Sequence, residues 1–162
     1  MKNKQILFLT QAALIGALYV VLTMISNALG LASMQIQVRF SEALTILPYF
    51  TPAAVPGVFV GCLMSNLLAG GALLDIIFGS LATLIAAVFT YLLRRFKWLA
   101  PVPPIVCNTL VVPFVIKYAY GIGPIWLSFF TVCAGEIISA GVLGMFLLFT
   151  LQKYRKQIFS MD

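Results

Sequence analysis

The stretch SEALTILPYFTPAAVPGVFVGCLMSNLLA, residues 41–69, decides the architecture of this chain, because it can form one long helix or two short ones. Three prolines, Pro48, Pro52 and Pro56, interrupt it. Each proline removes a backbone donor and disfavours helical geometry in the residue before it. The prolines therefore favour two helices with a turn near residues 51–52, and the charges elsewhere in the chain test that choice.

The rest of the chain is apolar enough for four further helices, expected at residues 5–29, 73–93, 101–118 and 125–152. Of the 162 residues, 62% are hydrophobic and only 9% are charged, which is the composition of a membrane protein. About 20 apolar residues span a bilayer, so these runs fill nearly the whole chain. We therefore expect a single transmembrane domain over residues 1–162. The first run is too long for a signal peptide and is interpreted as the first span.

Eight of the ten basic residues form three clusters at the expected helix ends: Lys2 and Lys4; Arg94, Arg95 and Lys97; and Lys153, Arg155 and Lys156. Such clusters are typical of the cytoplasmic side of membrane proteins. Two helices in residues 41–69 place all three clusters on one side, whereas one helix would place the middle cluster opposite the others. We therefore predict an all-α integral membrane protein, a bundle of six transmembrane helices with both termini in the cytoplasm. The second span is short, so neighbouring protein must cover its end.

The net charge of +6 is thus interpreted as a topology signal, and we expect no nucleic-acid partner. The first outer loop, residues 30–40, alternates in polarity from Met34 through Gln35, Ile36 and Gln37 to Arg39. This pattern fits either a short extended segment lying over the mouth of the bundle or a plain connector.

Polar residues gather in the outer half of the expected bundle. Glu42 begins the second span, Asp75 begins the fourth, and Glu136 lies roughly 17 Å below the outer end of the sixth at the usual helical rise. Charged groups at membrane depth are costly, which makes them candidates for function. The candidate ligand-binding residues are Glu136, Asn108, Asn66, Asp75, Glu42, Arg39, Gln37 and Lys117. Alternatively, these groups only hold helices together, with Glu136 paired to Lys117 or Arg39.

The sequence carries no motif for catalysis or nucleotide binding. It has no phosphate-binding G-x-x-x-x-G-K-[ST], no H-E-x-x-H, no nucleophile elbow and no histidine. Cys62, Cys107 and Cys133 fall singly within apolar runs and read as small buried hydrophobic residues. We therefore expect no enzyme, no catalytic residue, no metal and no cofactor in this chain. A transporter, a carrier subunit or a membrane interaction protein remains.

The run QIQVRFSEALTILP, residues 35–48, resembles the QueT family, the substrate-binding (S) components of energy-coupling factor (ECF) transporters. The stretches NLLAGG, residues 66–71, and LDIIFGSLAT, residues 74–83, are similar to the same family. The resemblance covers essentially the whole chain, and the RFSE segment, residues 39–42, is its most specific part.

The resemblance implies capture of a queuosine precursor, queuine or another 7-deazaguanine base, from outside the plasma membrane of a bacterium. An S component then topples in the membrane against a module of one transmembrane coupling protein and two ATPases, so that the partners use the ATP. Small residues on the first span of S components contact the coupling protein. Here Ala13 and Ala17 match that face, with Ala12 and Gly16 alongside.

A deazaguanine presents adjacent ring N–H and exocyclic amine donors, which one carboxylate can accept together. Glu136 is the first choice for that carboxylate, because it is the most deeply placed acid. Asn108 and Asn66 suit the carbonyl and the remaining ring edges, and Asp75 or Glu42 suits a cationic aminomethyl group. Three alternatives stay open: an S component for another vitamin-like solute, a small proton-coupled secondary transporter using Glu136, and a non-transporting scaffold. The secondary transporter would usually show an internal repeat, and none is clear here.

Overall fold

The computed structural model describes residues 2–31 and 36–159, and these residues form helices with no strand. Four continuous helical segments are long and apolar enough to cross a membrane: Lys4–Ala28, Asp75–Leu92, Lys97–Tyr120 and Ile125–Lys153. The first lies within α1 (Lys2–Ala28). The second consists of η3 (Asp75–Gly79) and α3 (Ser80–Leu92). The third consists of η4 (Lys97–Leu99), α4 (Val102–Val115) and η5 (Ile116–Tyr120). The fourth consists of α5 (Ile125–Glu136), η6 (Ile137–Leu143) and α6 (Gly144–Lys153), and the short α7 (Arg155–Ile158) follows it.

The proline-rich stretch forms two helices, as predicted. The first is the 3-10 helix η2 (Phe40–Tyr49), and the second is the apolar α2 (Ala54–Leu68). They are separated by a turn at residues 50–53, where the backbone N–H groups of Phe50 and Thr51 both donate to the carbonyl of Leu47. The turn falls where the prolines placed it.

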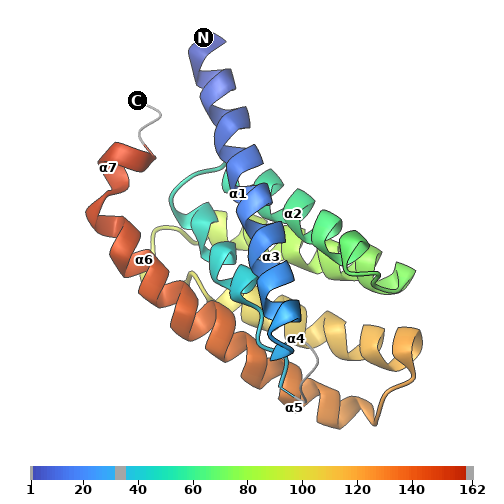
Figure 1. Cartoon of the computed structure of the whole chain (residues 1–162). Coiled ribbons are helices and arrows are strands. Elements are labelled where there is room, and N and C mark those ends of the chain that lie inside the picture. The colour runs from blue at the N-terminus through green and yellow to red at the C-terminus, as the bar shows by residue number, and fades with distance from the viewer. Residues whose placement is uncertain (1, 32–35, 160–162) are drawn as a thin grey trace.

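Helix η2 lies at the centre of the bundle, between α1 and α6 (Figure 1). Every residue from Ser41 to Tyr49 is buried, and the helix contacts α1, α2, α3, η6 and α6. Ten residues at the 3-10 rise of about 2.0 Å reach only about 20 Å. The expectation that neighbouring protein covers this short segment is therefore confirmed.

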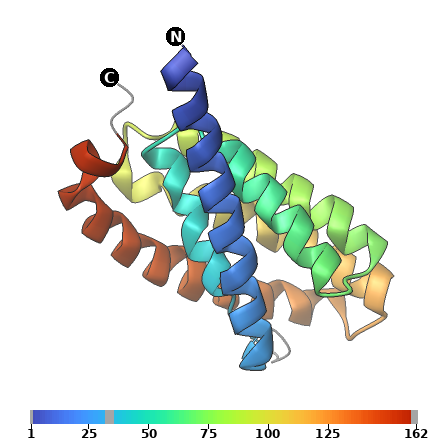
Figure 2. The same ribbon diagram turned by 45° about the horizontal axis from the view of Figure 1, so that its top comes forward.

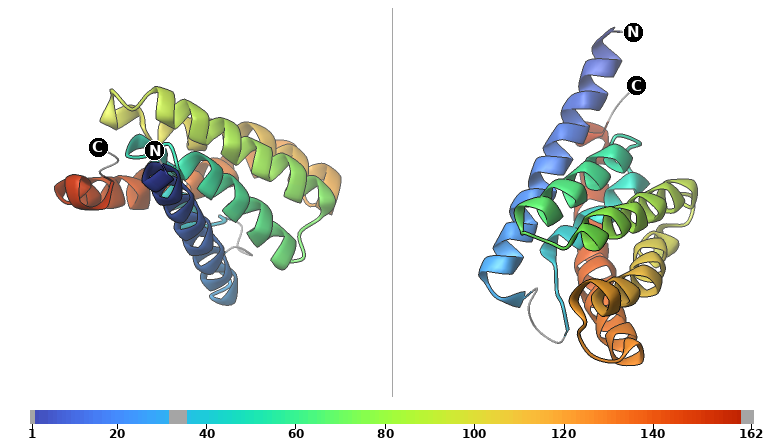
Figure 3. Two further views of the ribbon diagram at one scale, coloured as in Figure 1. Left: turned by 90° about the horizontal axis from the view of Figure 1, so that it is seen from above. Right: turned by 90° about the vertical axis from the view of Figure 1, so that its right-hand side faces the viewer.

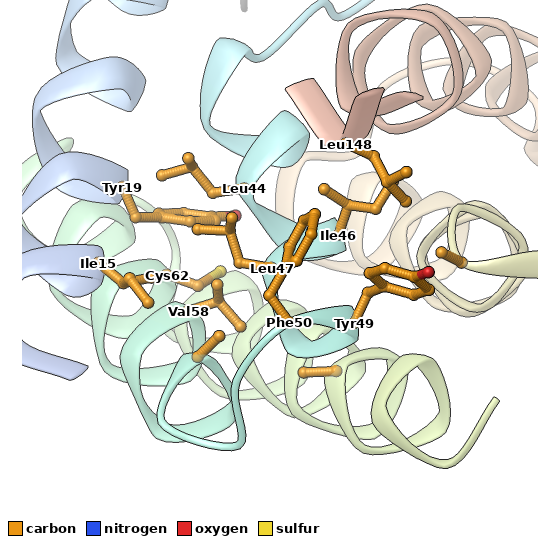
Figure 4. Packing of buried hydrophobic residues seen from close by; sticks show 13 residues of the cluster. Ile15, Tyr19, Leu44, Ile46, Leu47, Tyr49, Phe50, Val58, Cys62 and Leu148 are labelled. Carbon is orange, nitrogen blue, oxygen red and sulfur yellow. The ribbon is translucent and has the colours of Figure 1, made fainter. Parts of the chain in front are cut away.

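The hydrophobic core is built around η2 (Figure 4). Its own buried apolar side chains, Leu44, Ile46 and Leu47, pack with residues from α1, α2 and α6. Those partners are Ile15, Tyr19, Val58, Cys62 and Leu148. The core thus ties the centre of the bundle to three surrounding helices.

The contact between α1 and α2 depends on glycines. A Cβ atom on Gly61 would lie 2.7 Å from Tyr19 Cβ and 2.9 Å from the Gly16 carbonyl oxygen. A Cβ on Gly57 would lie 2.8 Å from the Ala12 carbonyl oxygen. Glycine therefore allows the two backbones to approach closely, while α1 otherwise lies at the edge of the bundle (Figure 3).

The first turn of α1 and the short helix α7 lie at one end of the bundle (Figure 2). The Gln11 side chain donates to the Ile158 carbonyl over 3.2 Å, and the rings of Phe50 and Phe159 stack with their centroids 5.0 Å apart. The Trp98 ring, which follows α3 in the chain, packs edge-on against Phe149 of α6. The helix ends that carry the three basic clusters therefore share one end, as charge parity predicted. Six membrane crossings and cytoplasmic termini remain a prediction.

Candidate ligand-binding site

Three buried side chains from three different elements meet in the middle of the bundle. Asn108 Nδ2 of α4 donates to Glu136 Oε1 of α5 over 2.9 Å and reaches Glu42 Oε2 of η2 at 3.4 Å. One amide nitrogen therefore bridges two carboxyl groups. The second oxygen of Glu136, Oε2, is buried and has no hydrogen-bond partner among the described residues. Three of the predicted ligand-binding residues, Glu136, Asn108 and Glu42, are thus brought together.

Tyr19 adds a fourth member that sequence reasoning missed. Its hydroxyl donates to Glu42 Oε1 over 2.5 Å, and its side chain is buried in α1. Each oxygen of Glu42 therefore has a donor, one from Tyr19 and one from Asn108. A signal existed in the sequence, because a tyrosine in the middle of an apolar span needs a partner for its hydroxyl.

The segment before η2 lies across the bundle and closes part of the site. The Arg39 backbone is extended, with φ −116° and ψ 117°, and its N–H donates to Ser139 Oγ over 3.1 Å. The Gln37 carbonyl packs so closely on Gly135 that a Cβ there would lie 2.2 Å from its oxygen. The extended backbone of Arg39 and the contact of Gln37 with Gly135 favour the expected extended segment over a plain connector, whereas Met34 and Gln35 lie outside the described residues.

The charge of Arg39 is maintained at the site. Burial lowers the pKa of its guanidinium, but the negative charge of Asp75, followed by weaker effects that include Glu42, raises it, and the net shift is upward. Arg39 thus supplies a fixed positive charge beside the carboxyl groups.

Asn66 and Asp75 form a second polar group nearer the outer end. Asn66 Nδ2 donates to the Asp75 carbonyl over 3.4 Å and to Cys62 Sγ over 3.6 Å. Tyr120 donates its hydroxyl to Asp75 Oδ2 over 3.2 Å and accepts the N–H of Ala72 over 3.0 Å. These contacts join the two loops at this end and place a carboxylate at the entrance.

Two adjoining cavities lie among these residues. The inner one, about 30 Å³, is lined by residues that include Glu42, Asn108 and Glu136. The outer one, about 730 Å³, opens at the end opposite the basic clusters. Both are lined by Gln37, Arg39, Asn66, Asp75, Val112 and Val132. The inner space holds little more than a water molecule, whereas the outer one is within the range of small-molecule pockets.

Lys117 lies apart from this group. It is exposed, and its Nζ donates to the Gly123 carbonyl over 3.4 Å in the outer loop. It is not among the lining residues of these two cavities. Glu136 accepts a hydrogen bond from Asn108. The described contacts therefore give no support to the alternative in which Glu136 pairs with Lys117.

The small residues of α1 divide between two faces. Gly16 is buried against α2, and the Ala12 carbonyl contacts the same helix at Gly57. Ala13 and Ala17 are exposed. Of the four candidates for contact with a coupling protein, Ala13 and Ala17 are the exposed ones, Ala12 is half-buried and Gly16 is buried.

Widened π-helical turns occur at the site. Helix η6 begins directly after Glu136, and η3 begins at Asp75. Such turns are frequent at functional sites, because they rotate the following side chains out of regular helical register. They place Ser139 where the Arg39 backbone can reach it.

Long apolar helices around a cavity that opens at one end of the bundle are the architecture of a helical membrane protein with a ligand-sized site. The family model described as QueT transporter matches residues 9–153, and the chain therefore belongs to the QueT transporter family. The family consists of transporters rather than enzymes, which confirms the expectation from the missing catalytic motifs.

The chain is similar to the queuosine precursor transporter QueT of Lactococcus lactis subsp. cremoris (strain MG1363). The two are 34% identical over 98 residues, which are 60% of this chain and 57% of the relative. The matched part thus spans little more than half the length of that relative. No solved structure matches the chain.

Proposed function

We propose that this chain is the S component of an ECF-type importer and captures a queuosine precursor, queuine or another 7-deazaguanine base. Membership of the QueT transporter family supports this function, as does the similarity to a queuosine precursor transporter. In this proposal the chain crosses the plasma membrane of a bacterium six times with both termini in the cytoplasm. The outer cavity then faces the outside, where the substrate is found.

The observation that carries the proposal is the buried, half-partnered carboxyl of Glu136 beside Asn108. An ionised carboxylate there offers a free oxygen, and its other oxygen has further lone pairs. The ring N–H and the exocyclic amine of a deazaguanine are adjacent donors that match this pair of oxygens. A paired, charge-assisted contact of this kind is strong in a site without water.

The outer part of the site suits the other end of such a ligand. The inner cavity of about 30 Å³ is too small for a two-ring base, so the base enters from the outer cavity and the residues between them move apart. Asp75 at the entrance can accept a cationic aminomethyl group, and Asn66 and Arg39 line the path between. Ligand entry therefore separates residues 37–39 from α5.

Import also requires an energy source, which in this proposal is a separate module. One transmembrane coupling protein and two ATPases supply ATP hydrolysis, and the chain topples against them in the membrane. The exposed Ala13 and Ala17 offer a small-residue face for the coupling protein, because small residues permit close helix contact in lipid. The chain itself contributes no cofactor.

Binding by the chain alone tests this function. The chain, purified in detergent, is titrated with queuine, 7-cyano-7-deazaguanine, 7-aminomethyl-7-deazaguanine and guanine, and binding is followed by calorimetry and thermal stabilisation. We expect saturable binding of at least one deazaguanine and much weaker binding of guanine. Glu136→Gln weakens binding about a hundredfold through loss of a charge-assisted pair. The control Thr10→Val, whose hydroxyl bonds only its own helix at Ile6, leaves the affinity unchanged.

Two results would redirect the assignment. If none of the deazaguanines binds, the substrate is withdrawn, and an S component for another vitamin-like solute becomes the leading function. If the chain imports its ligand into cells that lack the ATPases, the proton-coupled secondary transporter replaces the ECF mechanism.

A further inference from the structure

Glu42 and Glu136 are both buried, but they differ in the donors that they receive. Each oxygen of Glu42 accepts a hydrogen bond, from Tyr19 at Oε1 and from Asn108 at Oε2. Glu136 accepts only from Asn108, and its Oε2 has no partner among the described residues. Donors favour the ionised form of a carboxyl, and burial without donors disfavours it. Glu42 is therefore arranged as the anion of the pair and Glu136 as the neutral acid.

The surroundings do not supply enough positive charge for two buried anions. The charged and titratable groups that face the pair come from the segment before η2, from α1, from α2 and from η3: Arg39, Tyr19, Cys62 and Asp75. Arg39 is the one cation among them, against three carboxyl groups including Asp75. Two carboxyl groups on one amide nitrogen cannot both ionise without a large cost in a low dielectric.

We propose that the empty site holds one proton on the Glu42–Glu136 pair, carried by Glu136, and that a 7-deazaguanine base displaces it on binding. The inference rests on the proposed function and adds the protonation state of the site. The O–H bond of the Glu136 carboxyl breaks, the proton passes to water in the outer cavity, and two N–H···O hydrogen bonds from the base form. No other bond changes.

The chemistry of the base requires this exchange. A neutral carboxyl presents one donor and one acceptor side by side, which opposes the two adjacent donors of a deazaguanine. The ionised carboxyl presents two acceptors and matches them. The bound base supplies donors to the otherwise bare Oε2, so its arrival compensates for the charge that appears there.

The coupling has a defined sign. Protons and base compete for the same carboxyl, so acidification outside weakens capture, by up to tenfold in Kd per pH unit where the free site is protonated. A proton symporter would show the opposite relation, with the proton taken up together with its substrate. The titration belongs to the pair of carboxyl groups, since the two share Asn108.

Calorimetry on the wild-type chain measures how many protons are released per ligand bound. The probe is 7-cyano-7-deazaguanine, which has no amine side chain to titrate. At each of several values between roughly pH 5.5 and 8.5, binding is measured in two buffers that titrate at that pH and differ strongly in ionisation enthalpy. We expect a buffer-dependent heat that corresponds to release approaching one proton per ligand at the acidic end, together with the rise in Kd.

Two variants assign the proton. Glu136→Gln abolishes the release whatever affinity remains, and Tyr19→Phe, which removes a donor from Glu42, changes the pH at which release is half complete. Tight wild-type binding with no proton release at any pH would overturn the inference and leave the substrate assignment intact. Failure of the wild-type chain to bind any deazaguanine would overturn the proposed function, and the inference with it.

Discussion

The two ends of the bundle are built on different principles. At the end that carries the basic clusters, the rings of Phe50 and Phe159 stack. Towards the other end the bundle opens into a cavity of about 730 Å³, whose lining mixes apolar side chains with the polar Arg39, Asn66 and Asp75. The closed end lets the helices meet with little space, whereas the open end leaves room for a ligand. The difference teaches that the two ends of one small chain serve different purposes, while the core around η2 connects them through side chains such as Tyr19.

The sharpest test asks whether the two ends lie on opposite sides of a membrane. Ile122 and Phe96 have the same exposure, 62%, and lie at the open and the basic end respectively. With the native cysteines replaced, Ile122→Cys should react with a membrane-impermeant maleimide in intact cells. Phe96→Cys should react only after permeabilisation, because basic loops stay in the cytoplasm. Equal labelling of both positions in intact cells would contradict the six-span topology.

The next test probes the close packing of the closed half. Gly61→Ala places a methyl group 2.7 Å from Tyr19 Cβ and 2.9 Å from the Gly16 carbonyl, so α1 and α2 must move apart. We expect a loss of about 1–3 kcal/mol in the free energy of unfolding, measured by thermal or denaturant unfolding in detergent. In the matched control Gly141→Ala, the new methyl group would meet its nearest atoms at 3.7 Å and 3.8 Å, and stability should hardly change.

Tyr19 lies where the two halves meet, and its hydroxyl can be removed alone. Tyr19→Phe leaves Glu42 Oε1 without its donor and should cost about 1 kcal/mol, as side-chain hydrogen bonds within membranes typically do. Unfolding in detergent measures the change. Tyr118→Phe serves as the control, since Tyr118 is 72% exposed. An equal effect of the two substitutions would show that the contact of Tyr19 with Glu42 adds nothing to stability.

The smallest effect on the folded chain is expected at the exposed face of α1. Ala17→Leu should change the free energy of unfolding by less than about 0.5 kcal/mol, because Ala17 contacts no tightly packed neighbour in the way Gly16 does. In the proposed function the same substitution abolishes ATP-driven uptake, measured in cells with a labelled deazaguanine, while binding by the isolated chain persists. Normal uptake by this variant would remove Ala17 from the coupling interface.

Much of the fold follows from simple features of the sequence. Prolines and charge parity predict the two helices within residues 41–69, because both depend on local backbone chemistry and on the asymmetry of the membrane. The sequence also placed Glu42, Asn108 and Glu136 in the outer half of the bundle, although it put Glu42 at the outer end of its span and Glu136 deeper, so their meeting at Asn108 was not itself predicted. These predictions need no knowledge of side-chain packing.

Other features depend on packing and were beyond the sequence. The π-helical turns η3 and η6 have no sequence signature, because one extra residue in a helical turn is stabilised only by tertiary contacts. The contact of Gln37 with Gly135 joins residues far apart in the chain, and a glycine alone does not identify its neighbour. Lys117 was expected at the site because it lies at the outer end, but its side chain donates to the Gly123 carbonyl in the outer loop. Position along a span does not determine which way a side chain points.

The central 3-10 helix η2 also constrains how the protein is made. A segment about 20 Å long cannot cross a hydrocarbon core of about 30 Å unaided. The side chains of residues 41–49 are buried by neighbouring helices and do not face lipid. It contacts η6 and α6, so its final surroundings exist only after the ribosome has completed the C-terminal third of the chain. The surroundings of η2 are therefore complete only when α6 has joined the bundle, and we expect truncation before α6 to leave η2 uncovered on that side.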